Sequence, residues 1–154
     1  MEGLEMTKKS SDFWRNKRVL VTGHQGFLGS WLAKKLVESG AEVAGLDISK
    51  SNRNHILKDI GKKIKNIQGD IVDLRLVKRV MNNFKPQIVF HLAAQAIVGE
   101  AVKIPVRNFK SNIEGTWNVL EACRGSKFIE AVVVASSDKA YGAHKKLPYT
   151  EDMP

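Results

Sequence analysis

Apolar and polar positions follow one another along the chain in blocks that predict strands and helices by turns. The run Lys17–Thr22 is short, apolar and rich in β-branched residues, which is typical of a buried strand. From Phe27 to Ser39 the apolar positions recur at helical spacing, and Gly40 closes the predicted helix. A second strand is predicted over Glu42–Leu46, with Asp47 at its end.

The alternation continues through the rest of the chain. We predict a loop with a short helix over 49–61, strands over 63–68, 87–91 and 128–135, a helix over 74–84, and a helix over 106–123 preceded by Pro105. Strands that alternate with helices favour right-handed βαβ units and a parallel sheet. The expected fold class is therefore α/β, a Rossmann-type doubly wound sheet of five N-terminal strands with helices on both faces.

Three glycines, Gly23, Gly26 and Gly29, lie three residues apart between the first predicted strand and the first predicted helix. Glycine there permits a tight turn, lets the backbone approach a pyrophosphate, and lets the helix pack closely on the strand. The amides of Phe27 and Leu28 would face the phosphates, assisted by the helix dipole. The pattern predicts a dinucleotide-binding turn, with a merely structural turn as the alternative.

Asp47 ends the next strand, where a carboxylate can accept hydrogen bonds from both hydroxyls of an adenosine ribose and would repel a 2′-phosphate. This position favours NAD over NADP as the cofactor. Lys50 and Arg53 follow closely, however, and could attract a 2′-phosphate. A role as a turn or capping residue is the other interpretation of Asp47.

Net charge raises the question of nucleic-acid binding, because 25 Lys+Arg stand against 16 Asp+Glu and give a formal charge of +9. The cations are dispersed, and no helix-turn-helix, zinc or aromatic-basic module accompanies them, so we favour a solvated surface over nucleic-acid binding. No apolar stretch is long enough to span a membrane, and the N-terminus lacks the apolar core of a signal peptide. We expect a soluble, cytoplasmic protein.

The residues that most often hold metals or disulfides carry little signal here. Cys123 is the single cysteine, so we expect a packed thiol and no internal disulfide. The four histidines, His24, His55, His91 and His144, have no spacing typical of a metal site. We therefore expect no metal.

Five segments together carry a family resemblance. They are Val21–Gly29 (VTGHQGFLG), Gly69–Ile71 (GDI), His91–Gln95 (HLAAQ), Asn112–Ala122 (NIEGTWNVLEA) and Ser136–Gly142 (SSDKAYG). In this order they resemble the extended short-chain dehydrogenase/reductase family, the group of NAD-dependent sugar-nucleotide epimerases and dehydratases. The resemblance covers residues 13–154 and implies residues 1–16 as a lead-in and 17–154 as an NAD-binding Rossmann domain that is incomplete at its C-terminus.

The resemblance also implies roles for individual residues. Gln25 belongs to the cofactor-binding turn, Asp70 and Ile71 hold the adenine, and Asn112 supports the active site from its helix. The residues implied to line the cofactor cleft after the fourth strand are Leu92, Ala93, Ala94 and Gln95. For Asn112, a capping or packing amide is the alternative.

Within the family, the chain is most similar to CDP-glucose 4,6-dehydratases at Phe13–Trp14, Lys17–His24, Gly29–Leu32, His91–Gln95 and 137–139. Leu28 replaces a lysine common in that subgroup, and the loop over 141–152 is more like that of general epimerases and dehydratases. The resemblance thus implies a 4,6-dehydratase or an epimerase that acts on a nucleotide sugar, without choosing the sugar.

Ser137, Asp138 and Lys139 follow the fifth predicted strand, at the edge of the sheet where such folds bind ligands. In the dehydratase, the sugar C4 is oxidised by hydride transfer to NAD and water then leaves across C5 and C6. The resemblance makes Asp138 the acid, places Lys139 where the usual glutamate base lies, and gives Ser137 a hydrogen bond to the sugar hydroxyl. A lysine serves as base only where its pKa is lowered, and a solvated turn pair is the alternative.

The family deprotonates its sugar with a Tyr-x-x-x-Lys pair. Tyr141 and Lys145 have this spacing by coincidence, because the resemblance places them in the loop that precedes the pair, and they do not supply it. We therefore expect the chain alone to bind dinucleotide but to convert no nucleotide sugar. The fifth strand would expose an unpaired edge, which favours a homodimer or association with a missing C-terminal half. The alternative function is a non-catalytic NAD(H)-binding module that acts through a protein partner.

Overall fold

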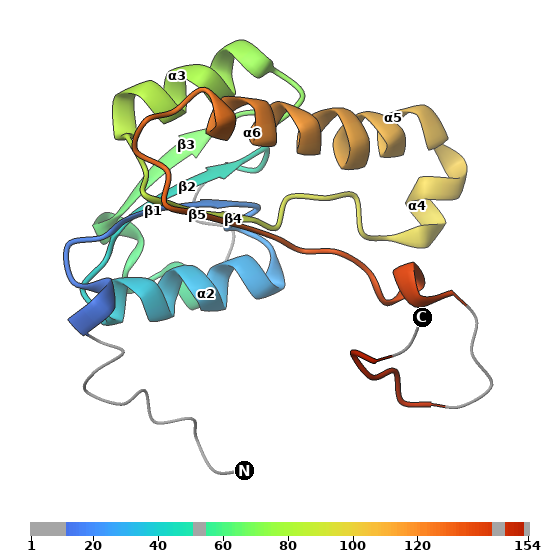
Figure 1. Cartoon of the computed structure of the whole chain (residues 1–154), viewed down its shortest axis with the longest axis horizontal. Coiled ribbons are helices and arrows are strands. Elements are labelled where there is room, and N and C mark those ends of the chain that lie inside the picture. The colour runs from blue at the N-terminus through green and yellow to red at the C-terminus, as the bar shows by residue number, and fades with distance from the viewer. Residues whose placement is uncertain (1–11, 51–54, 143–146, 153–154) are drawn as a thin grey trace.

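A computed structural model describes residues 12–50, 55–142 and 147–152, and these form a five-stranded parallel sheet in the order β3-β2-β1-β4-β5 (Figure 1). The strands are β1 (Arg18–Thr22), β2 (Glu42–Asp47), β3 (Ile64–Gln68), β4 (Ile88–His91) and β5 (Ala131–Val134). The strand order reverses between β1 and β4, because the chain continues from β1 to β2 and β3 on one side and returns to β4 on the other. In an open α/β sheet such a reversal leaves a crevice at the carboxyl ends of the strands.

Helices cover both faces of the sheet, as the alternating pattern predicted. Helix α2 (Phe27–Glu38) lies on one face, and α3 (Leu74–Phe84) and α6 (Gly115–Arg124) lie together on the other (Figure 1). Helix α6 continues a helical run made of α5 (Pro105–Phe109) and the π-helical turn η3 (Lys110–Glu114). The short elements are α4 (Val98–Lys103) and the 3-10 turns η1 (His55–Leu57), η2 (Gly61–Lys63) and η4 (Asp138–Tyr141).

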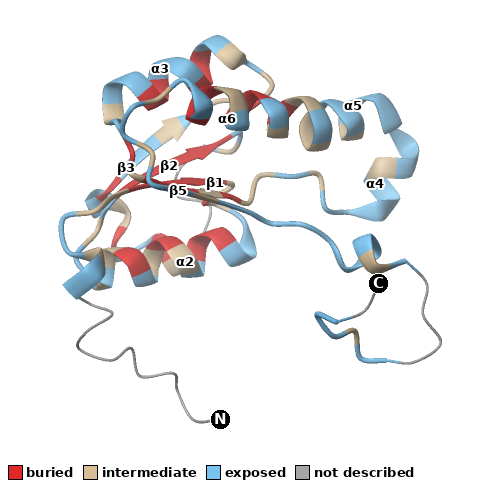
Figure 2. Ribbon diagram, in the orientation of Figure 1, coloured by how far each residue is buried: buried red, intermediate tan, exposed pale blue. Residues whose placement is uncertain are grey.

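Two hydrophobic cores form because successive strand residues point to opposite faces. Val19 and Val21 of β1 belong to the core under α2, together with Leu36. Leu20, between them, belongs to the core under α3 and α6, together with Val119. Figure 2 shows the buried residues on the strands and on the inward sides of these helices. Burial on both faces explains why the inner strands β1, β2 and β4 are mostly apolar without alternation.

Helix α3 begins and ends as its sequence predicted. The Asp73 carboxylate caps the helix by accepting hydrogen bonds from the amides of Arg75 and Leu76, at 3.0 and 3.1 Å. Lys85 ends the helix in the left-handed conformation at φ 52°, and Pro86 follows, which cannot continue a helix. Local chemistry thus sets both boundaries of this element.

The elements expected from the sequence differ from the structure in two places. The last strand was expected over 128–135 but pairs only over Ala131–Val134, because its partner β4 offers Ile88–His91. No element was predicted between the fourth strand and the long helix, and Val98–Lys103 of this segment forms α4. Because no residue of α4 is buried, its sequence carries no amphipathic pattern that would reveal a helix.

Cys123 is buried in the core under α3 and α6, and burial raises the pKa of its thiol to about 11. This environment keeps the thiol protonated, in agreement with the expected packed side chain. No helix in the described part of the chain is long and apolar enough to cross a membrane.

Candidate functional site

The glycine turn after β1 is held by backbone hydrogen bonds. Gly23 has a φ of 73°, and its amide donates to the carbonyl of Leu46 on β2 at 2.8 Å. The amide of Gly26 then donates back to the Gly23 carbonyl at 3.0 Å. A Cβ on Gly23 would lie 2.8 Å from the amide nitrogen of Ala93, and one on Gly29 would collide with the Gly23 carbonyl oxygen. Glycine is therefore required at position 23 for contact with the loop after β4, and at position 29 for contact between α2 and the turn itself.

Helix α2 starts directly from this turn, with Gly26 at its N-cap and no side chain capping it. The first amides of such a helix have no acceptor within the helix, so those of Phe27 and Leu28 remain for another group. The side chains of these two residues are exposed and lie outside the pocket described next. Any contribution they make to binding would therefore come from their backbone.

A pocket of about 320 Å³ lies beside the turn, at the carboxyl ends of the first four strands. Most of the residues implied to bind a cofactor line it together. These are Gly23, Gln25, Gly26, Asp47, Asp70, Ile71, Leu92, Ala93, Ala94 and Gln95. Four others that were expected to bind the cofactor, Phe27, Leu28, Gly29 and Asn112, do not line it. The pocket thus unites residues from four separate loops.

Asp47 serves as a brace at the end of β2. One carboxylate oxygen accepts a hydrogen bond from the amide of Gln25, and the other from the amide of Ser49, both at 2.9 Å. The first bond ties the glycine turn to β2. Each oxygen can accept a further bond, so the turn role and the ribose role expected from the sequence are compatible.

Charged residues near Asp47 have separate positions. The Asp70 carboxylate accepts from the amide of Val72 at 3.0 Å and lines the same pocket. Lys50 lines a second, smaller pocket with His24. Arg53, the other residue considered for a 2′-phosphate, lies outside the described residues. Of the two cations considered for a 2′-phosphate, the structure therefore describes only Lys50, which does not line the first pocket.

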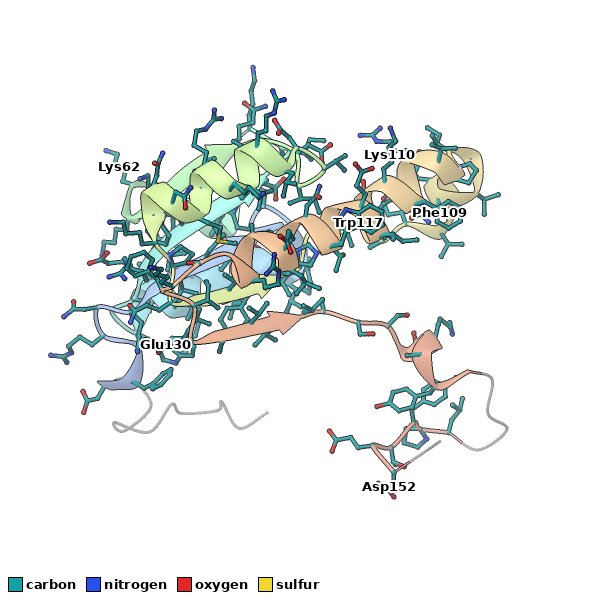
Figure 3. All side chains as sticks on the ribbon, turned by 45° about the horizontal axis from the view of Figure 1, so that its top comes forward. Lys62, Phe109, Lys110, Trp117, Glu130 and Asp152 are labelled. Atoms are coloured by element: carbon teal, nitrogen blue, oxygen red, sulfur yellow. The ribbon has the colours of Figure 1, made fainter. Side chains whose placement is uncertain are left out.

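Asn112 acts on the backbone of Gln95 and not on the pocket itself. Its side-chain oxygen accepts from the Gln95 amide at 2.7 Å, and its nitrogen donates to the Gln95 carbonyl at 3.2 Å. Asn112 lies in the π-helical turn; the exposed residues Phe109 of α5 and Trp117 of α6 flank this turn on the helical run (Figure 3). A helix residue thus positions the loop after β4, while a direct contact of Asn112 with the cofactor stays a prediction.

Ser137, Asp138 and Lys139 lie after β5 on an exposed 3-10 turn and do not line the pocket. Lys139 Nζ and Asp138 Oδ2 form an ion pair at 3.2 Å. Their hydrogen bond lowers the pKa of Asp138 and raises the pKa of Lys139, assisted by their opposite charges. An aspartate that acts as general acid needs a raised pKa, and a lysine that acts as general base needs a lowered pKa. Their acid and base roles remain predictions that require this pair to separate.

Two described histidines pack against the strands. His24 Nε2 lies 2.7 Å from Asn66 Oδ1, and a Cβ on Gly45 would collide with its ring. His91 bridges Thr22 Oγ1 at 2.7 Å and Thr116 Oγ1 at 3.0 Å. The structure describes no group of three or more potential metal ligands within residues 12–50, 55–142 and 147–152.

Stability is expected to fall as the pH drops below about 6.5, because burial lowers the pKa of His91 below that ordinary value. The unfolded chain then binds a proton that the folded chain does not, so the stability present above this pH is lost at up to about 1.4 kcal/mol per pH unit. Urea unfolding at several pH values measures the slope. His91→Gln keeps hydrogen-bonding groups but cannot titrate, and an unchanged slope in this variant would contradict the assignment.

Sequence reasoning missed several residues that line the pocket. They are Leu46, Ile48, Ser49, Gly69, Arg107 and Ser111. The first four are neighbours of predicted residues and could have been found by extending each motif by one or two positions. Arg107 and Ser111 come from the helical run α5–η3, and no motif marked them.

The chain is similar in sequence to proteins of known activity. Residues 20–154 match the family model described as GDP-mannose 4,6 dehydratase. The CDP-glucose 4,6-dehydratase of Salmonella typhimurium is 39% identical over 132 residues, which cover 84% of this chain and 37% of that protein. The UDP-glucose 4-epimerase of Lactobacillus helveticus is 36% identical over 89% of this chain and 40% of that protein. The chain therefore spans less than half the length of these relatives.

Solved structures show the same arrangement. An epimerase from Methanothermobacter thermautotrophicus matches with a TM-score of 0.82 at 33% identity, over 93% of this chain and 42% of that chain. The UDP-glucose 4-epimerase of Bifidobacterium longum, solved in complex with NAD+ and UDP, matches with a TM-score of 0.79 at 30% identity. That match covers 90% of this chain and 42% of the epimerase chain. The predicted fold class is thereby confirmed.

Proposed function

Because the chain belongs to the GDP-mannose 4,6 dehydratase family, we propose that it is the NAD-binding part of a sugar-nucleotide 4,6-dehydratase or 4-epimerase. The observation that carries the proposal is the pocket, which joins the glycine turn, Asp47, the Asp70–Ile71 pair and the Leu92–Gln95 loop in one cavity. The NAD+ complex of the Bifidobacterium longum epimerase supports the choice of cofactor.

The turn fits a pyrophosphate. Gly23 and Gly26 line the pocket without side chains, so a ligand can approach the backbone closely. The uncapped amides at the start of α2 offer hydrogen-bond donors and the positive end of the helix dipole to an anion. Backbone groups of the turn would thus bind the phosphates.

The two ends of the pocket fit the two nucleoside halves. Asp47 would accept hydrogen bonds from the adenosine ribose, while Ile71 supplies an apolar wall and Asp70 a polar edge for the adenine. The loop Leu92–Gln95 continues the pocket past β4 and would carry the nicotinamide half. The loop is kept in place by Asn112, as its hydrogen bonds to Gln95 indicate.

Bound NAD would supply the acceptor for the hydride that leaves the sugar C4. In that reaction Ser137 would donate a hydrogen bond to the sugar, and Asp138 would transfer a proton once its ion pair with Lys139 opens. Tight packing of Gly29 against the turn, and the hydrogen bonds of Asn112 to the Gln95 loop, would hold the walls of the cofactor pocket in place.

Calorimetric titration of the chain with NAD and with NADP tests the proposal. We expect NAD to bind about tenfold more tightly, since the Asp47 carboxylate accepts from the ribose hydroxyls and repels a 2′-phosphate. Tighter binding of NADP would overturn the choice of cofactor. If neither dinucleotide bound, the proposed function would be wrong.

A further inference from the structure

The pocket beside the glycine turn has an excess of negative charge. Asp47 and Asp70 line it as carboxylates, and Arg107 is the only lysine or arginine among the described residues that line it. The pyrophosphate of a dinucleotide would bring further negative charge into the same cavity. Because the protein lowers the dielectric constant, these like charges would repel one another more strongly than in water. A cation in this pocket would therefore favour the binding of a dinucleotide.

Arg107 has its guanidinium available for that purpose. Its side chain is exposed and forms no ion pair or hydrogen bond with any residue in the described part of the chain. Arg124, on the same helical run, differs because its guanidinium is held by Glu121 at 2.7 Å. The charge of Arg107 is thus not already neutralised by a protein carboxylate.

The fold holds the backbone of Arg107 next to the pocket. Ser111 lies one turn further along and lines the same pocket, so one side of the α5–η3 run faces the cavity. The two hydrogen bonds between Asn112 and the backbone of Gln95 tie this run to the loop after β4. The π-helical turn over Lys110–Glu114 occurs at this attachment, and such turns are frequent at functional sites.

We propose that Arg107 is a binding residue whose guanidinium neutralises the pyrophosphate of the dinucleotide held in this pocket. The inference rests on the proposed function, because it assigns a role within the same NAD site. Arginine suits this task, since its planar donors can pair with two phosphate oxygens at once. The α5 helix would then add a side-chain contact to the phosphates beside the backbone amides of the glycine turn.

The test compares Arg107→Gln with the unaltered chain by calorimetry, using NAD, ADP-ribose and adenosine. We expect the Kd of NAD and of ADP-ribose to rise about tenfold, because a charge-assisted contact to phosphate is lost. The Kd of adenosine, which has no phosphate, should change by less than about twofold. Arg107→Lys keeps the charge and should recover most of the lost affinity.

The matched control is Arg79→Gln, which lowers the net charge equally at an exposed position of α3 outside the pocket. Equal effects of the two glutamine variants on NAD binding would overturn the inference, because net charge alone would explain them. Equal weakening of adenosine and NAD by Arg107→Gln would overturn it too, since the arginine would then contact the base. Both outcomes differ from a failure of the proposed function, in which the unaltered chain itself would not bind NAD.

Discussion

Gly29→Ala is expected to weaken NAD binding by about a hundredfold or more and to destabilise the chain by about 2 kcal/mol. The added methyl group would collide with the Gly23 carbonyl oxygen, which is backbone and cannot rotate away. Relief requires α2 to move away from the turn, and the amides that would bind the pyrophosphate move with it. Calorimetry with NAD and urea unfolding measure the two effects.

Gly99→Ala is the matched control for this substitution. Gly99 lies in α4, and a Cβ there would meet no atom within 4 Å. Alanine normally stabilises a helix relative to glycine by up to about 1 kcal/mol, so this variant should lose neither stability nor NAD affinity. The two substitutions are chemically identical, and opposite signs of their stability changes would reveal the contact between Gly29 and Gly23. If Gly29→Ala proved as harmless as the control, the tight turn would not be required for binding.

Asp47→Ala is expected to weaken NAD binding by about tenfold to a hundredfold and to cost about 1–2 kcal/mol of stability. The carboxylate accepts hydrogen bonds from the amides of Gln25 and Ser49, and it would accept from the ribose in the complex. Its removal loses the ribose contact and frees the glycine turn from β2. The same calorimetric and unfolding measurements apply, and the preference for NAD over NADP should also diminish.

Asp73→Ala is the control that separates the contribution of Asp47 to stability from its contribution to NAD binding. The Asp73 carboxylate also accepts from two backbone amides, those of Arg75 and Leu76, but it caps α3 outside the pocket. Its loss should cost about 1 kcal/mol, as for other N-cap residues, and leave NAD affinity unchanged. Should Asp47→Ala behave in the same way, Asp47 would be only a structural brace and the turn interpretation would replace the ribose interpretation.

Much of the architecture could be predicted because it depends on local patterns. The boundaries of both α2 and α3 follow from apolar spacing and from the residues that end helices. A capping aspartate, Asp73, also marks the start of α3. The end of β5 could not be predicted in this way, because pairing with β4 limits it to Ala131–Val134. The family resemblance, which rested on several motifs in one order, is confirmed by the match over residues 20–154.

The candidate site likewise contains residues that motifs predicted and residues that only the structure revealed. Motif residues such as Asp47 and Ile71 line the pocket, because each comes directly after a strand and parallel strands end at one edge of the sheet. Arg107 went unnoticed, because no pattern near it indicates that its helix faces the cavity. Asp138 and Lys139, for which the resemblance implied acid and base roles, form an exposed ion pair outside the pocket, and those roles stay predictions.

The sequence by itself determined the order of strands and helices, the glycine turn and the acidic residue after β2. These features need only spacing along the chain, since strand and helix periodicity and glycine's freedom at φ 73° are local properties. Only the tertiary structure decided that Asn112 holds the Gln95 loop and that Arg107 reaches the pocket. Both depend on how one helical run packs across the sheet, and contacts between distant segments leave no periodic trace in the sequence.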